Sequence, residues 1–131
     1  MKQSRGFTVI ELLVVLVLLG VGSWLFFTEK ASITATQRDS ARKTAINAMY
    51  YNLEEAYYQQ HGSYPATIDS KTLRAMDPAL FSDPLGVKLG SAGSNYRYDG
   101  IGCTTDGACK GYKLTSSMER ESDYEKRSRN N

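Results

Sequence analysis

The amino-terminal part of the chain contains one long apolar stretch that follows a short basic segment, residues 1–6. Residues 7–27 are apolar except for Thr8, Glu11 and Ser23. A helix of this length extends over roughly 32 Å, which is enough to cross the hydrocarbon core of a bilayer. The pattern therefore predicts a membrane-spanning helix over residues 7–27.

A second helical pattern follows without interruption. Residues 28–60 contain neither proline nor glycine, and apolar side chains recur there at helical spacing. The members of this stripe are Ala41, Ala45, Met49, Leu53 and Tyr57, with Ile46 and Tyr50 beside them. Four polar residues lie largely off the stripe, and we expect them on a solvated face: Arg42, Lys43, Asn47 and Glu54.

The end of the helical pattern is marked by two residues. Gly62 favours termination because glycine accepts a positive φ, and Pro65 cannot continue a helix. The pattern predicts one helix from Phe7 to Gln60, roughly 80 Å long. Its amphipathic part, residues 28–62, would continue into a globular head.

The rest of the chain has the turn and loop signals of a small β-containing domain, which we assign to residues 63–118. The segment 83–86 (DPLG) indicates a turn. β-prone residues at 95–98 and 112–115 flank a Gly/Asp-rich loop and predict an antiparallel hairpin. We therefore predict an α+β fold, a long helix packed against a small antiparallel sheet. Residues 119–131 are mostly polar and predict a charged, flexible tail.

The length and the net charge of the chain limit the number of domains and the classes of binding partner. A chain of 131 residues has room for one small soluble domain beside the apolar segment. The formal net charge is +2, and Lys2 and Arg5 account for it, so the remainder is neutral. A neutral body gives no electrostatic basis for nucleic-acid binding. The two basic residues keep the amino end cytoplasmic and place the remainder outside.

A secretory signal peptide is the main alternative for the apolar stretch. The stretch continues past Ser23 into Trp24–Phe27 without a small-x-small cleavage site, which disfavours this alternative.

Glu11 is the only charged residue in the apolar stretch. A carboxylate near the bilayer centre costs about 2.5–3.5 kcal/mol, so it needs a partner or a shallow position. Taken alone, Glu11 is as consistent with a residue without a specific role, either hydrated near the membrane surface or protonated, as with a functional one.

Residues 6–12 (GFTVIEL), followed by a spanning apolar run, strongly resemble the processing signature of type IV prepilins and of type II secretion pseudopilins. The resemblance implies that a membrane-embedded peptidase cuts after Gly6 and methylates the new amine of Phe7. It also implies that Glu11 guides assembly. Residues 37–65 resemble the second half of pilin helices. The DPLG turn followed by residues 96–98 resembles the start of the sheet in major pseudopilins and small pilins.

The resemblance implies a pilin fold and a structural role as a filament subunit. Identical copies would form a helical filament with the help of the prepilin peptidase/methyltransferase, a membrane platform protein and an assembly ATPase. The subunit would lie in the cytoplasmic membrane before assembly and in an extracellular or envelope-spanning filament afterwards. Two alternatives stay open: a pseudopilin of a secretion or DNA-uptake machine, and a monomeric membrane-anchored binding protein.

The helix departs from the family pattern at one place. Many members carry a proline where this chain has Thr28, and Gly20, Gly22 and Ser23 lie nearby instead. Glycine costs about 1 kcal/mol relative to alanine within a helix, so Gly20 and Gly22 are the predicted weak point.

Cys103 and Cys109 are the only cysteines. Their spacing and their location outside the cytoplasm favour a disulfide that closes the hairpin loop, with a contribution of roughly 2–2.5 kcal/mol. Two thiols with the distant His61 make a poor zinc set. Four scattered aspartates could resemble the calcium site of some major pseudopilins, but they form no dense ligand motif: Asp77, Asp83, Asp99 and Asp106. The sequence therefore predicts neither a metal site nor a cofactor site.

Catalytic motifs are missing from the sequence. It has no nucleophile elbow, no phosphate-binding glycine loop and no paired-histidine metal spacing, so we expect no enzymatic activity. The nine tyrosines concentrate near the end of the helix, where we expect them to pack it against the sheet.

Overall fold

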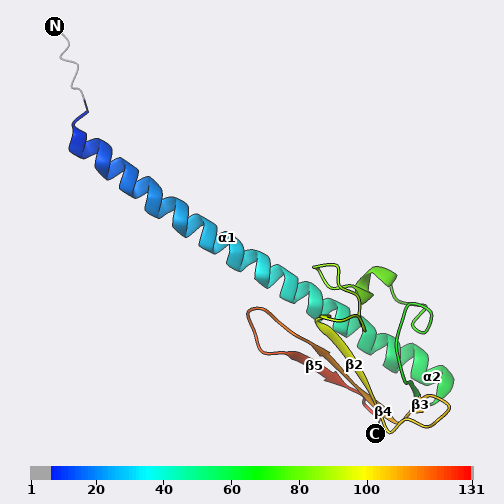
Figure 1. The fold of residues 1–131 in the computed structure, drawn as a ribbon. Coiled ribbons are helices and arrows are strands. Elements are labelled where there is room, and N and C mark those ends of the chain that lie inside the picture. The colour runs from blue at the N-terminus through cyan, green and yellow to red at the C-terminus, as the bar shows by residue number, and fades with distance from the viewer. Residues whose placement is uncertain (1–6, 131) are drawn as a thin grey trace. The chain divides into compact units, whose positions relative to one another are not determined.

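The computed structural model describes residues 7–130, so the predicted leader, residues 1–6, and its Gly6 lie outside the described residues. It has one long amino-terminal helix and small antiparallel sheets, which confirms the predicted α+β class (Figure 1). By its internal contacts the chain divides into two units, residues 1–35 and residues 36–131. We describe each unit separately.

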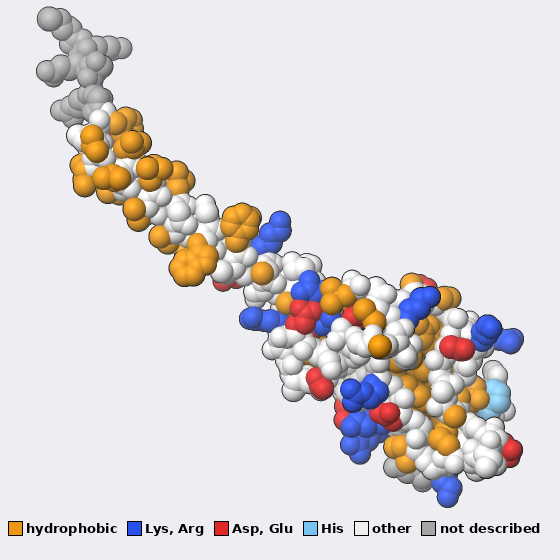
Figure 2. Space-filling model, in the orientation of Figure 1, with side chains coloured by type: hydrophobic (Ala, Val, Ile, Leu, Met, Phe, Trp, Pro, Cys, Tyr) orange, Lys and Arg blue, Asp and Glu red, His pale blue; other side chains and the backbone are white. Residues whose placement is uncertain are grey.

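The first unit consists of the apolar part of helix α1, which spans Val9–Tyr51. Every side chain from Phe7 to Phe27 is exposed, and hydrophobic side chains cover this part of the helix in Figure 2. The helix passes through Gly20 and Gly22 without a break. An 18-residue window of the helical run has a mean hydropathy of 2.5, so it is long and apolar enough to cross a membrane.

The carboxyl end of the helix is not regular. After α1 the chain forms a π-helical segment, η1 (Asn52–Tyr57), and then α2 (Tyr58–His61). Gly62 ends the helix with φ 68°, and its N–H donates to the Tyr58 carbonyl at 2.8 Å. The predicted helix end is therefore confirmed. The π-helical segment was not predicted, and its wider turn accompanies the burial of both Leu53 and Glu54.

The second unit contains two antiparallel sheets. Strand β2 (Tyr96–Ile101) pairs with β4 (Gly111–Ser116), and β5 (Tyr124–Arg127) pairs with the other edge of β4. A smaller sheet joins β1 (Tyr64–Pro65) to β3 (Ala108–Cys109). The β2–β4 pair is the predicted hairpin, and its strands are longer than the sequence indicated.

The prediction of a flexible tail over residues 119–131 is wrong, because part of this segment forms strand β5. The hydroxyl of Tyr124 donates to Asn47 Oδ1 at 3.0 Å, and Lys113 of β4 pairs with Glu125 at 2.8 Å. The polar groups of the strand thus meet partners on the helix and on the neighbouring strand. The polar composition of this segment predicts disorder, because the sequence does not show these long-range partners.

The core of the head forms where the helical stripe meets the sheets. Its most deeply buried apolar side chains are Ala45, Ile46, Met49, Leu53, Tyr64, Leu73, Cys109, Tyr112 and Leu114. Burying one large apolar side chain contributes about 1.5–3 kcal/mol, so this cluster fixes the helix on the sheet. The ring of Tyr58 in α2 stacks on that of Tyr64 at 4.8 Å, and the rings of Tyr64 and Tyr112 lie 4.8 Å apart. Tyrosines therefore pack the helix against the sheet, as the sequence predicted.

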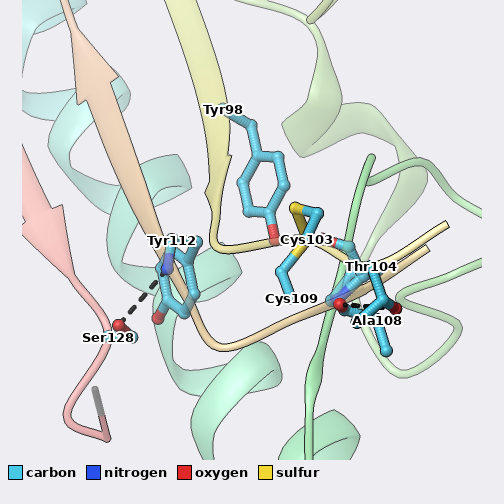
Figure 3. The surroundings of a disulfide bond; sticks show 8 residues. Tyr98, Cys103, Thr104, Ala108, Cys109, Tyr112 and Ser128 are labelled. Carbon is cyan, nitrogen blue, oxygen red and sulfur yellow. Dashed lines mark hydrogen bonds between the residues drawn. A yellow bond between two sulfur atoms is a disulfide. The ribbon is translucent and has the colours of Figure 1, made fainter.

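A disulfide joins Cys103 to Cys109 and closes the loop between β2 and β4 (Figure 3). Within the loop, the Thr104 N–H donates to the Ala108 carbonyl at 2.9 Å. A Cβ added at Gly100 would lie 2.7 Å from Cys103 Sγ and 2.8 Å from Cys109 Sγ. Glycine is therefore required in this part of β2, because the two sulfur atoms occupy the space of a side chain.

We expect Gly100→Ala to destabilise the head by roughly 1–3 kcal/mol, because the added methyl group overpacks the disulfide. Thermal unfolding followed by the near-UV circular dichroism of the tyrosines measures the change. The matched control places the same substitution in a Cys103→Ala, Cys109→Ala background, where the sulfur atoms are gone. The interpretation fails if the penalty of Gly100→Ala is equally large in both backgrounds.

Candidate functional site

The first candidate site is the start of helix α1, where Phe7 and Thr8 precede the first helical residue. The Glu11 N–H donates to Thr8 Oγ1 at 3.3 Å, and the Leu12 N–H donates to the Thr8 carbonyl at 3.1 Å. Thr8 is thus the N-cap and Glu11 the third helical residue, which is the spacing of a capping box. Sequence reasoning missed this role of Thr8, although the T-x-x-E pattern indicates it.

Glu11 also benefits from its position in the first turn. A negative charge there is favoured by the helix dipole. Phe7 is 79% exposed, and Glu11 is exposed as well. None of the ion pairs found within residues 7–130 includes Glu11. The arrangement leaves a carboxylate one turn from the Phe7 backbone, accessible to a partner outside the subunit.

The predicted site residues are divided between the two units. Phe7, Glu11, Gly20 and Gly22 lie in the first unit, whereas Cys103 and Cys109 lie in the second. The groups that carry the charge chemistry of the head were not predicted.

Arg42 is the centre of a buried charge cluster in the head, with a side chain that is 1% exposed. Its Nη1 lies 3.0 Å from Asp39 Oδ1 and 2.9 Å from Glu119 Oε1, and its Nη2 lies 3.6 Å from Asp83 Oδ2. Asp39 belongs to the helix, Glu119 to the loop before β5, and Asp83 to the loop before β2. The prediction that Arg42 lies on a solvated face is wrong, because both loops cover that face of the helix.

Asp39 is ionised within this cluster despite its burial. Burial raises its pKa, but N–H donors from Glu119 and Arg120 at 2.9 and 2.8 Å, together with Arg42, outweigh that effect and lower the pKa. The bidentate contact from Arg38 is the largest influence on Glu119 and holds its pKa at about 2. The cluster thus joins the last loop of the chain to the helix.

Asp83 connects the same cluster to the turn that the sequence predicted. Its Oδ1 accepts N–H groups of Leu85 and Val87 at 3.0 and 2.9 Å, and its Oδ2 accepts the Asn95 amide. Burial raises the pKa of Asp83, but these donors and Arg42 lower it overall. The four aspartates considered for calcium do not converge: no metal-binding group of three or more acidic, histidine or cysteine side chains exists in the part of the chain described.

Glu54 is the second buried charge that sequence reasoning placed on a solvated face, and that prediction is also wrong. Its carboxylate accepts the hydroxyls of Tyr112 and Tyr64 at 2.9 and 3.0 Å and the Arg129 N–H at 3.2 Å. Burial raises the pKa of Tyr112, and its hydrogen bond to Glu54 raises it further. Glu54 therefore joins the helix, both sheets and the carboxyl end of the chain.

The charge cluster predicts acid sensitivity. Asp39, Asp83 and Glu119 have folded-state pKa values below their unfolded values of about 4. A lowered folded pKa contributes stability that is present above the unfolded pKa and is lost as pH falls through the folded pKa. We expect the free energy of unfolding to fall between about pH 4.5 and pH 2 and to stay nearly constant from pH 5 to 8.

Urea unfolding of the detergent-solubilised chain, followed by near-UV circular dichroism, measures this profile. Glu119→Gln should flatten the acid limb, since it removes one of the titrating groups. Asp123→Asn, an exposed carboxylate outside the cluster, is the matched control. Equal slopes for Glu119→Gln and the wild type would contradict the assignment.

Comparison with known proteins agrees with the geometry of the amino-terminal segment. Residues 1–27 match the family model of the prokaryotic N-terminal methylation motif. No curated protein and no solved structure matches the chain. The matched range includes Gly6, Phe7 and Glu11, together with the N-cap Thr8. Residues 1–27 therefore carry the prokaryotic N-terminal methylation motif, the class III signal peptide of a type IV pilin-like or pseudopilin-like prepilin.

Proposed function

We propose that this chain is a structural, non-enzymatic subunit that polymerises into a type IV pilus filament on the cell surface. The observation that carries the proposal is the methylation motif at the start of a helix whose apolar side chains are all exposed from Phe7 to Phe27. An apolar surface of this extent is stable only in lipid or against other apolar helices. A filament core supplies such helices from further copies.

The proposed parts of the subunit follow the sequence. Residues 1–6 are a leader that the prepilin peptidase removes, and residues 7–27 span the membrane and then enter the filament core. Residues 28–62 continue the helix into the head, residues 63–118. Residues 119–130 belong to the head as well, because strand β5 pairs there.

Assembly in this proposal depends on one charge pair. Cleavage after Gly6 creates a cationic amine on Phe7, and the exposed carboxylate of Glu11 lies one helical turn further on. An amine buried in one subunit and a carboxylate buried in the next satisfy each other only in the correct stagger. Because an unpaired buried charge costs several kcal/mol, the pair selects the register of the filament.

The proposed assembly requires other proteins at each step. Before assembly the subunit lies in the cytoplasmic membrane with its amino end in the cytoplasm, where the peptidase/methyltransferase acts on it. A membrane platform protein and a cytoplasmic ATPase then drive its transfer into the filament.

The first alternative is a pseudopilin of a type II secretion or DNA-uptake machine, which has the same processing and the same register pair. Electron microscopy of sheared cell-surface material separates the two, because a long isolatable fibre containing this chain favours the pilus. A monomeric membrane-anchored binding protein is the other alternative, and it would need neither cleavage at Gly6 nor a carboxylate at Glu11.

Processing gives a direct prediction. The mature protein should begin at Phe7 with a methylated amine, because only cleavage there frees the amine that Glu11 meets. Intact-mass measurement of protein from the native host should show the loss of residues 1–6 and the gain of one methyl group. A mature chain that retains Met1, or that is cut near Ser23, would overturn the proposal.

Substitution of the register carboxylate gives a second prediction. Glu11→Val should leave insertion and cleavage intact, because the span becomes more apolar, but should abolish or strongly reduce filaments. The Phe7 amine would then be buried unpaired at a cost of a few kcal/mol. Glu11→Gln should be intermediate, since it keeps a hydrogen-bond acceptor. Immunoblots of membrane pools and of sheared filaments measure the two steps separately.

Glu29→Val is the matched control, because Glu29 is an exposed acidic residue of the same helix outside the motif. It should assemble within about twofold of the wild type, because Glu29 lies outside the charge pair proposed to set the register. Normal polymerisation of Glu11→Val would show that the carboxylate does not set the register.

A further inference from the structure

The head has an open groove between the end of the helix and the segment 71–80. A hollow of about 640 Å³ at the α2 end and a hollow of about 450 Å³ further back along the helix share three lining residues, Asn52, Ala56 and Ala75. The two hollows are therefore parts of one surface, which we call the docking groove. It lies entirely within the second unit.

One end of the docking groove is cationic. Lys71, Arg74 and His61 line the larger hollow, and no acidic residue does. Neither Lys71 nor Arg74 takes part in an ion pair with any residue from 7 to 130. Arg74 Nε donates to the Lys71 carbonyl at 3.2 Å, and the His61 ring stacks on Tyr57 at 4.1 Å. The first contact holds the Arg74 side chain, and neither contact neutralises the charge of Lys71 or Arg74.

The other end of the docking groove is more apolar. Ala48, Tyr51, Met76 and Leu80 line the smaller hollow, and Tyr51 is 56% exposed. Two acidic residues also line this hollow: Glu55, which is already paired with Arg129 at 2.7 Å, and the exposed Asp77, whose carboxylate accepts the Ala79 N–H at 2.9 Å. The groove thus offers an apolar contact at one end and unpaired positive charge at the other, so its occupant should be apolar and anionic.

The end of strand β2 and the loop after it, residues 99–107, which we call the disulfide loop, have acidic and apolar groups that complement the groove, with the exposed Lys110 beside Gly102. Asp99 and Asp106 are exposed, and neither takes part in an ion pair among the residues described. Ile101 is 48% exposed. The disulfide restricts the conformations of the loop, so docking would order little additional chain.

We propose that the docking groove binds the disulfide loop of a second copy of this chain. The contact is heterologous, since groove and loop are different surfaces, and a heterologous contact that does not close into a ring propagates as a helical filament. The inference rests on the proposed filament function and adds a contact between heads to the register pair of the helices. Its acidic and basic groups lie at the rim, where complementary charge selects the partner and the register.

Charge reversal tests the contact in the full-length chain in its native host. Lys71→Glu with Arg74→Glu, and separately Asp99→Lys with Asp106→Lys, should each lower the yield of sheared filaments by at least about fivefold, because like charges then meet. The combined variant restores opposite charges and should return to within about twofold of the wild type. The membrane pool of each variant should stay unchanged.

Lys88→Glu with Arg120→Glu is the matched control, because it makes the same change in charge at exposed positions outside the docking groove. It should assemble within about twofold of the wild type, as expected for exposed charges without partners. A loss of filaments equal to that of the groove variants would overturn the proposal.

Photo-crosslinking tests the contact without any change of charge. A benzophenone amino acid at Ala75, an exposed residue of the groove, should link to the loop peptide of a neighbouring chain in assembled filaments. Isotope-mixed filaments distinguish links between chains from links within a chain. Links to another segment of the chain or to another protein would overturn the inference, as would wild-type yields from both reversal pairs. Absence of any wild-type filament would instead overturn the proposed function, and this inference with it.

Discussion

The exposed apolar surface from Phe7 to Phe27, most of it on α1, is the constraint on which the rest of the molecule depends. Water disfavours this surface by about 25 cal/mol per Å², so the segment needs lipid or other apolar helices around it. Neither environment offers directional polar contacts along the side of the helix. Glu11, whose N–H donates to the N-cap Thr8, is the one charged side chain from Phe7 to Phe27, and in the proposed assembly it supplies the directionality that dispersion and packing do not.

The head faces a different constraint, because a small domain has a limited apolar core. It uses two buried carboxylate centres, one around Arg42 and one at Glu54, to join segments that are distant in sequence. Buried charges contribute little net stability unless every polar atom is satisfied, but removing one partner is costly. These centres therefore specify where the loops and the carboxyl-terminal strand lie, while Leu53 and its apolar neighbours supply the burial.

The parts of this molecule that sequence predicted are those encoded locally. The residues from Gly6 to Glu11 form a linear signal, Gly62 ends the helix by its own backbone freedom, and the β2–β4 pair follows from β-prone residues around one loop. Burial of Arg42 and Glu54 was not predictable, because it depends on loops and a strand about 40 to 80 residues further along the chain.

Strand β5 was missed for a related reason. Its alternation of half-buried and exposed side chains lies within a charged segment, where composition alone indicates disorder. The capping box at Thr8 differs from these cases, since its signal is local and a closer reading of the T-x-x-E spacing identifies it.

The π-helical segment η1 has a consequence for how this helix tolerates changes in length. A π-turn contains one residue more than an α-turn. The residues after it are therefore rotated about the helix axis by about 100° relative to their places in an uninterrupted α-helix. Deleting one residue between Asn52 and Tyr57 would return the segment to α-helical hydrogen bonding and leave the phase of α2 and of the Gly62 cap unchanged. The same deletion would rotate Glu54 relative to Tyr64 and Tyr112. The helix axis is thus insensitive to a one-residue deletion here, whereas the buried hydroxyl–carboxylate contacts are not.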